Sequence, residues 1–545
     1  MSKYGASTSL PNPVPEFEKI SDYLYAHGKR KPDAEALVWN ERRIDYQSFS
    51  SAVETLSRAL IAYGVERGDR IGFLGAPRPE FLIVMMAVVD IGAIWMGLHP
   101  RYQLEEFRHV VEQAAPKLIF AFEEIENRIY SPELESLKKE FEFIEEIVIL
   151  NSVLKRDCSM SHRGVGISFD QFLGFANNCD WDRLVSAREL VEADDPAVII
   201  FTSGTTGKPK GAMNSHFGLV YCAHIELSRW PDSDMRVLQN MPINHIANIG
   251  MMSSCALVAG GCLVFQDRFE PGDLLRIIEQ EKITFWLQSP VQFHMVAAHP
   301  DFNNTDLSSL KYIIWGGGPM PRHLVEKLIK LDANLATAYG MTELTCYVTY
   351  SDADTTAETM ANIIGRPEPR YNLRLITDED KEAGVGQSGE IQARGRWLMK
   401  GYFNQPEETL KAYTADGWFK TGDVAELCED GNWKLVGRLK EMYKSGGYNI
   451  YPREIEIAIE QHPAVALTAV LGISHDLYDE VGYAFVEPVS GQQVTDSELS
   501  DWCRKRLANY KVPKKFEIVE SLPRLPIGKI DKQLLKKNLE KYEVG

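Results

Sequence analysis

The chain has few cysteines, and their positions suggest no disulfide framework. Eight cysteines are spread along 545 residues, and no two of them form a Cys-x-x-Cys pair. Dense, paired cysteines are typical of oxidising compartments, whereas scattered thiols stay reduced in a reducing one. We therefore predict reduced thiols and a cytoplasmic location.

The sequence also lacks a secretory signal, a terminal address and an unbroken transmembrane run. The stretch before Glu18 contains three prolines and no apolar run, and the last four residues match no targeting or lipidation motif. The longest apolar run, residues 81–98, is interrupted by Asp90 and Gly92. Because a charge near the centre of a bilayer costs at least ~2.5 kcal/mol, we expect a buried helix that Gly92 ends, then a short strand, and no integral membrane contact.

Positive charge is in deficit. The formal net charge is −18, which argues against a general nucleic-acid binder, because such proteins draw most of their affinity from a basic surface. A local basic site for a nucleotide stays open. With 44% apolar and 25% charged residues, the chain is globular and long enough for at least two domains.

Short apolar strands alternate with helices through most of the chain. Strands are predicted at residues 70–74, 117–120 and 146–150, with a helix after Pro79, and Gly260-Gly261 separates another helix from the strand at 262–265. This alternation predicts an α/β fold with stacked, mainly parallel sheets.

Other segments follow different patterns. Residues 17–65 predict helices around a hairpin of two strands, and residues 151–195 read as an irregular polar connector. After about residue 360, short strands separated by Gly and Asp turns suit a small β-barrel or sheet. Residues 438–545 form a compact α+β unit of normal domain size.

One stretch, residues 201–211, has the composition of a phosphate-binding loop. It follows the apolar strand at 197–200 and differs from a Walker loop, because Pro209 follows the lysine and only two residues separate the glycines. A flexible surface linker is the alternative reading. The groups that suit phosphate are the glycines Gly204 and Gly207, the hydroxyls of Thr202, Ser203, Thr205 and Thr206, and the cations Lys208 and Lys210.

Further short stretches carry chemistry. Gly316–Gly318 follow the strand at 312–314 and would let a flat ligand lie against the backbone. A second strand end places Tyr339 and Glu343 close together, and a carboxylate beside a phosphate loop is a natural partner of Mg²⁺. A capping Glu and a core Tyr stay open as alternatives. Thr421-Gly-Asp423 is expected in a turn, where Asp is often only turn chemistry, and His245 could equally be an ordinary loop histidine.

In this order and spacing, the stretches resemble one family, the adenylate-forming acyl-CoA synthetases, which are related to firefly luciferase and to peptide-synthetase adenylation domains. The resemblance covers nearly the whole chain. Three segments match its signatures for phosphate (202–211), for adenine and metal (339–343) and for ribose (421–423). Residues 437–454 resemble its hinge and the loop that follows, and residues 523–529 resemble the loop with the catalytic lysine.

The resemblance implies a two-step reaction. A carboxylate attacks the α-phosphate of MgATP to give an acyl-adenylate and pyrophosphate, and the thiol of coenzyme A then displaces AMP to give a thioester. The chain would be an acid-thiol ligase, an AMP-forming acyl-CoA synthetase of fatty acid metabolism. It would use ATP, Mg²⁺ and coenzyme A with a small-molecule carboxylic acid and no nucleic acid, and a homodimer is left open.

The same resemblance assigns roles to residues. Lys529 would bridge the acyl carboxylate and the phosphate, Thr342 would contact the α-phosphate, and Glu343, with Thr202, would hold Mg²⁺. Tyr339 would stack on adenine, and Asp423 would accept hydrogen bonds from the ribose hydroxyls. The implied ATP-binding set is Thr202, Ser203, Gly204, Thr205, Thr206, Gly207, Lys210, Gly316, Gly317, Gly318, Tyr339, Gly340, Met341, Asp423 and Arg438.

The domain boundaries follow from the same likeness. An N-terminal AMP-binding domain would span residues 1–437, with a β-barrel-like subdomain at about 360–437, and a C-terminal domain would span 438–545. In the family the small domain turns about a hinge, here near Lys440, and presents a loop, here Gly446-Gly447, that forms a tunnel for the pantetheine arm.

The acyl pocket departs from the family pattern. Asn244 stands where relatives have an aromatic residue, and the segment from His245 to Gly250 looks one residue longer than usual. The candidate lining, His245, Asn248, Ile249, Trp315 and Met341, is mostly apolar, which favours a medium-chain, aromatic or alicyclic acid.

Three other functions were weighed against this reading. A ligase that loads an acyl carrier protein and a luciferase-like oxygenase stay open as alternatives. The presence of both Lys529 and Glu343 argues against a non-catalytic nucleotide-binding sensor.

The two-step scheme makes Lys529 specific to the first step. Lys529→Ala is expected to abolish adenylation while thioester formation from pre-made acyl-adenylate continues, because the lysine loop would leave the site before the second step. Single-turnover assays of each half-reaction measure both. Equal loss of the two half-reactions would contradict the two-conformation assignment.

Overall fold

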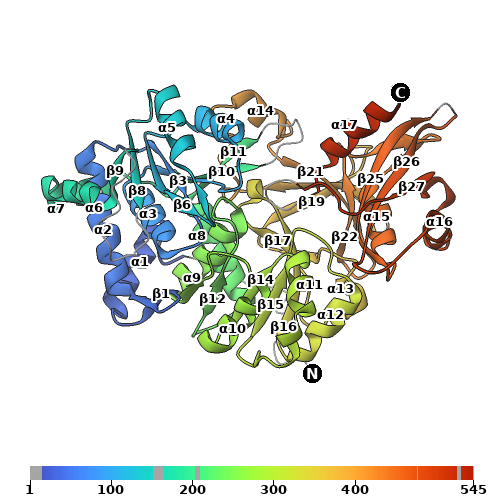
Figure 1. Cartoon of the computed structure of the whole chain (residues 1–545), viewed down its shortest axis with the longest axis horizontal. Coiled ribbons are helices and arrows are strands. Elements are labelled where there is room, and N and C mark those ends of the chain that lie inside the picture. The colour runs from blue at the N-terminus through green and yellow to red at the C-terminus, as the bar shows by residue number, and fades with distance from the viewer. Residues whose placement is uncertain (1–14, 151–164, 203–208, 476, 525–529, 544–545) are drawn as a thin grey trace.

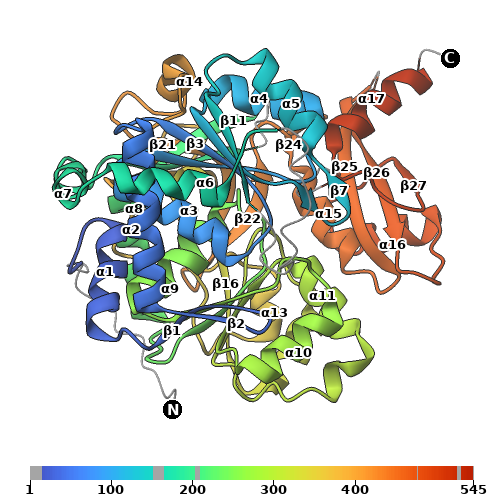
Figure 2. The same cartoon turned by 60° about the vertical axis from the view of Figure 1, so that its left-hand side comes forward.

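The computed structural model describes residues 15–150, 165–202, 209–475, 477–524 and 530–543. Figure 1 shows a large body built on two sheets and a smaller C-terminal part, which lies beside that body in Figure 2 as well. The predicted α/β class, with stacked, mainly parallel sheets and a small α+β unit at the end, is confirmed.

The first sheet has seven strands in the order β11-β10-β4-β3-β5-β8-β9, and all neighbours are parallel except β10 and β11. Its strands are β3 (Arg70–Leu74), β4 (Ile94–Leu98), β5 (Leu118–Phe122), β8 (Glu146–Leu150), β9 (Ile167–Ser168), β10 (Pro196–Thr202) and β11 (Lys210–Ser215).

The second sheet has nine strands in the order β18-β17-β16-β15-β14-β12-β13-β1-β2 and is parallel from β16 to β1. Its strands are β1 (Glu35–Trp39), β2 (Arg42–Asp45), β12 (Arg236–Gln239), β13 (Cys262–Phe265), β14 (Phe285–Gln288), β15 (Tyr312–Trp315), β16 (Asn334–Gly340), β17 (Tyr347–Tyr350) and β18 (Arg366–Pro367).

Where the sequence predicted a small barrel or sheet, four antiparallel strands form a sheet in the order β19-β20-β21-β22. The C-terminal part has a sheet of its own, in which only β27 is parallel to its neighbour. These strands are β19 (Asn372–Ile376), β20 (Ser388–Arg394), β21 (Phe419–Leu427), β22 (Trp433–Arg438), β23 (Tyr443–Ser445), β24 (Tyr448–Ile450), β25 (Val465–His475), β26 (Asp479–Pro488) and β27 (Lys515–Ile518), and a small pair is β6 (Glu124–Ile125) with β7 (Arg128–Ile129).

Helices cover the sheets. One core cluster joins side chains of both large sheets with α2, α3, α8 and α9, and a second lies under α10, α11 and α12 on the other face of the nine-stranded sheet. The α-helices are α1 (Ile20–Arg30), α2 (Tyr46–Tyr63), α3 (Pro79–Asp90), α4 (Leu104–Ala114), α5 (Ser131–Glu140), α6 (Phe169–Leu173), α7 (Trp181–Glu189), α8 (His216–Arg229), α9 (Ser254–Ala259), α10 (Pro271–Glu281), α11 (Pro290–Ala298), α12 (Arg322–Leu328), α13 (Ala357–Met360), α14 (Pro406–Lys411), α15 (Pro452–Glu460), α16 (Asp496–Arg504) and α17 (Lys532–Glu543).

The apolar run at 81–98 forms a buried helix and a strand, as predicted. Gly92 has φ +75°, the left-handed conformation that ends the helical segment before β4. Asp90 is buried, but its carboxylate pairs with Arg188 at 2.8 Å and accepts hydrogen bonds from Tyr25 and Ser57. The charge inside the run is therefore paired and hydrogen-bonded. Among the described residues, no helix is long and apolar enough to cross a membrane.

Two local predictions were wrong. Residues 165–195 are not an irregular connector, because Ser168 and Asp180 cap the helices α6 and α7 with their side chains. Thr421-Gly-Asp423 does not lie in a turn between strands. It lies inside β21, where the register to β20 shifts and Gly422 has φ +74°, so the segment is a bulge that re-aims the Asp423 side chain.

Candidate functional site

The phosphate-loop segment connects two paired strands. β10 ends at Thr202, β11 begins at Lys210, and these two residues are partners in the antiparallel ladder. The Thr202 hydroxyl donates to the Lys210 carbonyl at 3.4 Å. Five predicted phosphate ligands, Ser203, Gly204, Thr205, Thr206 and Gly207, lie outside the described residues, as do Lys208 and the predicted catalytic Lys529.

Lys210 already has an anionic partner. Its ammonium group pairs with Glu408 of α14 and lies 5.1 Å from the centroid of the Tyr402 ring. Hydrogen bonds from Lys210 and Lys411 lower the pKa of Glu408 to about 2. Lys210 is therefore held at the root of the phosphate loop by a carboxylate from a segment almost 200 residues further along the chain.

Glu343 is a buried carboxylate held by one neutral donor. It is 5% exposed, and the Tyr402 hydroxyl donates to its Oε1 at 2.9 Å. Burial raises the pKa of Glu343, and the hydrogen bond from Tyr402 opposes that rise. Because the Tyr402 ring also lies under Lys210, this tyrosine connects the predicted metal ligand to the phosphate-loop strand.

The turn that carries Glu343 is fixed from two sides. Asn214 of β11 donates to the Thr342 carbonyl and to the Thr345 hydroxyl, both at 2.9 Å. The Thr345 hydroxyl in turn donates to the Trp397 carbonyl at 2.7 Å. Thr345 has φ +63°, an unusual and strained conformation for a β-branched residue, so its hydrogen bonds with Asn214 and Trp397 must help to hold it there.

A second set of predicted residues also meets. Asp423 is buried, and it accepts a hydrogen bond from the Tyr339 hydroxyl at 2.7 Å and one from Arg438 Nε at 2.9 Å. The Asp423 carboxylate raises the pKa of Arg438. Tyr339, Asp423 and Arg438 thus form one hydrogen-bonded unit, from β16, β21 and β22.

The glycines differ in what surrounds them. A Cβ on Gly316 would strike the Tyr347 hydroxyl, and one on Gly340 would strike the Cys346 carbonyl, so both are needed for packing. Gly317, with φ +77°, has nothing within 4 Å of an added Cβ, and Gly318 has only a proline ring atom at 3.9 Å. The bare backbone that could face a flat ligand is therefore at Gly317 and Gly318.

The predicted acyl-pocket residues divide between two faces of the nine-stranded sheet. Ile249 packs in the core cluster between the two large sheets, whereas Trp315 packs in the cluster on the opposite face. Asn248 is fully buried, and the half-buried His245 accepts the Ala247 N–H at Nδ1, 3.1 Å away. Met341 is half-buried and begins the Glu343 turn.

The residues from Ala247 to Ser253 form a π-helix. Such a helix takes one more residue per turn than an α-helix, which accounts for a segment that looks one residue too long.

The predicted hinge and tunnel residues lie in or beside the C-terminal part. Lys440 is exposed just after β22, and Gly446 and Gly447 join β23 to β24 with φ +57° and +86°. The Gly446 N–H donates to the Tyr478 carbonyl at 2.9 Å, within the same part. The structure therefore does not bring this loop to Glu343 or Asp423 among the contacts of the described residues.

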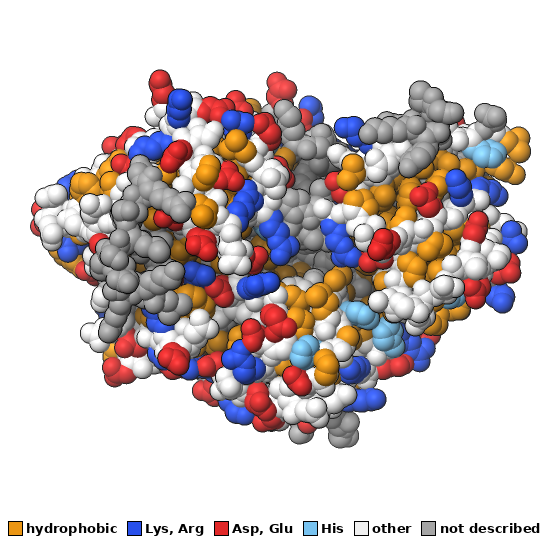
Figure 3. Space-filling view, viewed as in Figure 1, with side chains coloured by type: hydrophobic (Ala, Val, Ile, Leu, Met, Phe, Trp, Pro, Cys, Tyr) orange, Lys and Arg blue, Asp and Glu red, His pale blue; other side chains and the backbone are white. Residues whose placement is uncertain are grey.

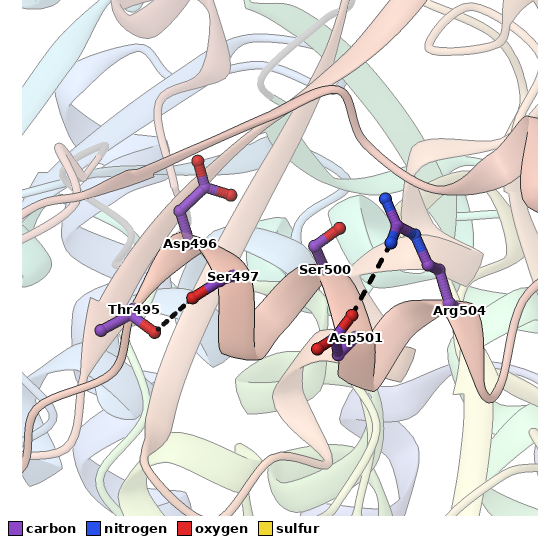
Figure 4. Close-up of a pocket in the computed structure, with 6 residues that line it drawn as sticks. All are labelled: Thr495, Asp496, Ser497, Ser500, Asp501 and Arg504. Carbon is purple, nitrogen blue, oxygen red and sulfur yellow. Dashed lines mark hydrogen bonds and ion pairs between the residues drawn. The ribbon is translucent and has the colours of Figure 1, made fainter.

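Two surface hollows are candidates for a ligand site. Figure 4 shows one on α16, lined by side chains of that helix and its cap that are mostly exposed, in which Asp501 pairs with Arg504 at 3.7 Å. The other, of about 530 Å³, lies between the four-stranded sheet and the segment at Asn449–Tyr451, and Asp378, Glu379, Glu382 and Glu390 make it acidic. Neither suits a phosphate ligand. Figure 3 shows that the outline of the molecule is notched between the large body and the C-terminal part.

Several residues of the site carry no sequence signal that we used. Tyr402, Glu408 and Asn214 touch the predicted ligands, but they stand outside every signature segment. Only their side-chain contacts reveal them.

Known proteins share this architecture. The AMP-binding enzyme family matches residues 24–403, and the AMP-binding enzyme C-terminal domain matches residues 454–529. A feruloyl-CoA synthase of Amycolatopsis sp is 33% identical over 512 residues, covering 94% of this chain and 97% of that protein. An indoleacetate–CoA ligase of Aromatoleum aromaticum is 31% identical over 519 residues, with 94% and 97% covered.

A solved structure agrees in fold. The o-succinylbenzoate CoA synthetase of Bacillus subtilis, in complex with its acyl-adenylate intermediate, superposes with a TM-score of 0.78 at 25% identity. The superposition covers 94% of this chain and 97% of that one.

The raised pKa of Glu343 predicts a cost in stability. When the folded pKa lies above the unfolded one, ionisation at higher pH destabilises the fold, and below the unfolded pKa the penalty is absent. Glu343→Gln keeps an acceptor for Tyr402 and removes the buried charge. At pH 8 it should increase the free energy of unfolding by about 1–3 kcal/mol and raise the thermal midpoint by a few degrees. The gain should shrink as the pH falls through the folded pKa.

The control for that melt is Glu408→Gln, which removes a half-buried, ion-paired carboxylate of low pKa and should give no stabilisation at pH 8. A Glu343→Gln gain that is the same at pH 5 and pH 8 would contradict the burial argument.

Proposed function

The chain belongs to the AMP-binding enzyme family, and we propose that it joins an aromatic carboxylic acid to coenzyme A in two steps, through an acyl-adenylate. The observation that carries the proposal is the contact of Glu343, through Tyr402, with Lys210 at the root of the phosphate loop. The relatives that act on ferulate and indoleacetate support an aromatic acid. Medium-chain acids, the substrates named for more distant relatives, are the alternative.

Mg²⁺ fits the Glu343 site. A buried carboxylate whose only described side-chain donor is a neutral hydroxyl gains most from a cation, because a cation restores its charged form. Among the described residues, no cluster of three or more His, Cys, Asp or Glu could hold a metal ion. Mg²⁺ bound there would thus take the remaining ligands from phosphate and water, as it usually does, and would neutralise charge on the phosphates.

The protein's own groups orient the nucleotide. Asp423 keeps lone pairs for the ribose hydroxyls after accepting from Tyr339 and Arg438, because each carboxylate oxygen can accept two hydrogen bonds. Adenine would lie along the open backbone of Gly317 and Gly318. Lys210 would exchange Glu408 for the departing phosphates, and Lys529 would meet the charge that develops on the attacked phosphoryl group.

The division at residue 437/438, the hinge at Lys440 and the Gly446-Gly447 tunnel are part of the same proposal. They describe how the second step would replace the lysine loop by a path for the thiol. The exposed position of Lys440, directly after the last strand of the large body, is what a hinge requires.

A panel of carboxylic acids tests the function directly. Aromatic acids should release pyrophosphate from ATP with the highest kcat/KM, above alicyclic and medium-chain acids, and AMP release should then depend on coenzyme A. Release that depends on an acyl carrier protein, or oxygen consumption with the acyl-adenylate, would instead support the two alternatives. An absence of pyrophosphate with every acid would contradict the proposal.

Tyr402 is predicted to set the acidic limb of the pH profile. Tyr402→Phe removes a hydrogen bond that lowers the pKa of Glu343, so protons should compete with Mg²⁺ at higher pH than in the wild type. At pH values below the limb, kcat/KM for MgATP should be about tenfold lower in Tyr402→Phe than in the wild type, because a hydrogen bond to a charged acceptor is worth ~1.5 kcal/mol. At pH values above the limb, the difference should be small.

Tyr413→Phe is the matched control, because the Tyr413 hydroxyl donates to the Met399 carbonyl at 3.4 Å and, within the described ranges, to no carboxylate. A loss of activity in Tyr402→Phe that is equal at all pH values would show a merely structural role.

A further inference from the structure

A chain of buried amides ends at the carboxyl edge of the nine-stranded sheet. It begins at the Met241 carbonyl, which accepts from Asn248 Nδ2 at 2.6 Å. The Asn248 Oδ1 then accepts from Gln239 Nε2 at 3.1 Å, and the same nitrogen donates to the Ser253 hydroxyl at 2.8 Å. Gln239 is the last residue of β12 and is 0% exposed.

The direction of these hydrogen bonds is determined by the Met241 carbonyl, at which the series begins. A backbone carbonyl can only accept, so Asn248 must turn its NH₂ group toward Met241 and its oxygen toward Gln239. Gln239 must therefore donate to Asn248, which leaves its own Oε1 at the end of the chain. That oxygen is enclosed and has no hydrogen-bond partner among the described residues.

An enclosed acceptor without a donor costs about 1–3 kcal/mol, so such an atom calls for an explanation. Other buried polar atoms also lack partners among the described residues, but Trp95 and Trp286 lie inside their strands, β4 and β14. Trp39 ends β1 at the same edge as Gln239, but its unpaired atom is an N–H donor and not an acceptor. In open α/β sheets, ligands bind outside the carboxyl ends of the strands, which is where Gln239 stands.

Gln239 contacts one residue of the predicted acyl pocket, Asn248. Its side chain shares a sheet face with Val237, which packs in the same core cluster as Ile249 and Tyr347. The π-helix from Ala247 to Ser253 supplies two of its hydrogen-bond partners. The Tyr347 hydroxyl lies against Gly316, next to the open glycines of the nucleotide site.

We propose that Gln239 Oε1 accepts a hydrogen bond from a hydroxyl or N–H group at the end of the acid remote from its carboxylate. The preferred substrates are then aromatic acids with a ring hydroxyl or ring N–H. Gln239 is a residue that determines specificity, and the inference rests on the proposed function of the site. A pocket built to pair a donor rejects the analogue that lacks it far more strongly than an apolar pocket rejects a change in size.

A second series of hydrogen-bonded amides, on the opposite face of the sheet, provides a matched control. Starting at the Glu270 carbonyl, Gln266 Nε2 donates at 3.1 Å, Asn240 donates to Gln266 Oε1 at 2.9 Å, and Gln288 Nε2 donates to Asn240 Oδ1 at 2.6 Å. Gln288 is also 0% exposed and ends this chain with an Oε1 that has no partner among the described residues. Gln288 follows Leu287 in β14, so its side chain points to the opposite face of the sheet from Leu287. That is the face of Trp286, covered by α10–α12 and away from the π-helix.

The first experiment uses the wild-type enzyme and measures kcat/KM by pyrophosphate release. We compare cinnamate with its 3- and 4-hydroxy and 4-methoxy derivatives, and indole-3-acetate with its N-methyl derivative. At least one hydroxyl or N–H acid should exceed both its unsubstituted and its methylated analogue by tenfold or more. Equal use of hydroxy and methoxy acids overturns the inference, because a methoxy group can accept but cannot donate.

The second experiment repeats the series with Gln239→Met and Gln288→Met, which keep similar volume and remove the amide. Gln239→Met should reduce the preference to within about twofold by lowering kcat/KM for the donor acid, and Gln288→Met should retain it. A preference that survives Gln239→Met, or is lost equally in Gln288→Met, overturns the assignment. If Gln239→Met does not fold, as judged by its thermal melt, the wild-type series still decides.

These outcomes separate the two levels of proposal. Activation of aromatic acids without a donor preference removes only the role of Gln239, whereas no pyrophosphate release with any acid removes the proposed function itself.

Discussion

The burial of the Glu343 carboxylate is the constraint on which the arrangement of the site depends. A carboxylate taken out of water needs compensation, and the fold supplies it from a distant segment. Tyr402 donates to the Glu343 carboxylate, and the Met399 N–H donates to the backbone carbonyl of Glu343 at 3.0 Å. This requirement brings residues 397–402 back onto the turn, and with them α14 and the Glu408 that holds Lys210.

The two carboxylates of the site are compensated in different ways. Asp423 has a guanidinium group beside it and a tyrosine hydroxyl on its other oxygen, so its charge is paired inside the protein. Among the described residues, Glu343 has only a neutral side-chain donor, and burial raises its pKa. A cation therefore stabilises the site most at Glu343, and a neutral hydroxyl pair suits Asp423. The proposed division between a metal ligand and a ribose ligand is consistent with the partners that each carboxylate already has.

Local rules were sufficient for much of the fold and for part of the site. Gly92 and Gly260 end helices in the left-handed conformation, and the strands that follow them lie where the apolar runs predict. The signature residues form two sets: Thr202 and Lys210 reach Glu343 through Tyr402, and Tyr339 at the end of β16 meets Asp423 in the bulge of β21.

The two wrong predictions have different causes. At residues 165–195 the local caps Ser168 and Asp180 were overlooked, whereas at residues 421–423 a tertiary contact overrides the local pattern. The bulge at Gly422 reads as a turn in sequence, because Gly and Asp mark both, and only pairing with β20 distinguishes them. Tyr402 and Asn214 belong to ordinary strand or loop patterns, and the positive φ of Thr345 has no residue-type signal at all. The residues predicted to bind the nucleotide stand in short motifs, whereas Gln239 lies outside every motif. The role that we propose for Gln239 rests on its unpaired Oε1, which only the direction of the surrounding hydrogen bonds reveals.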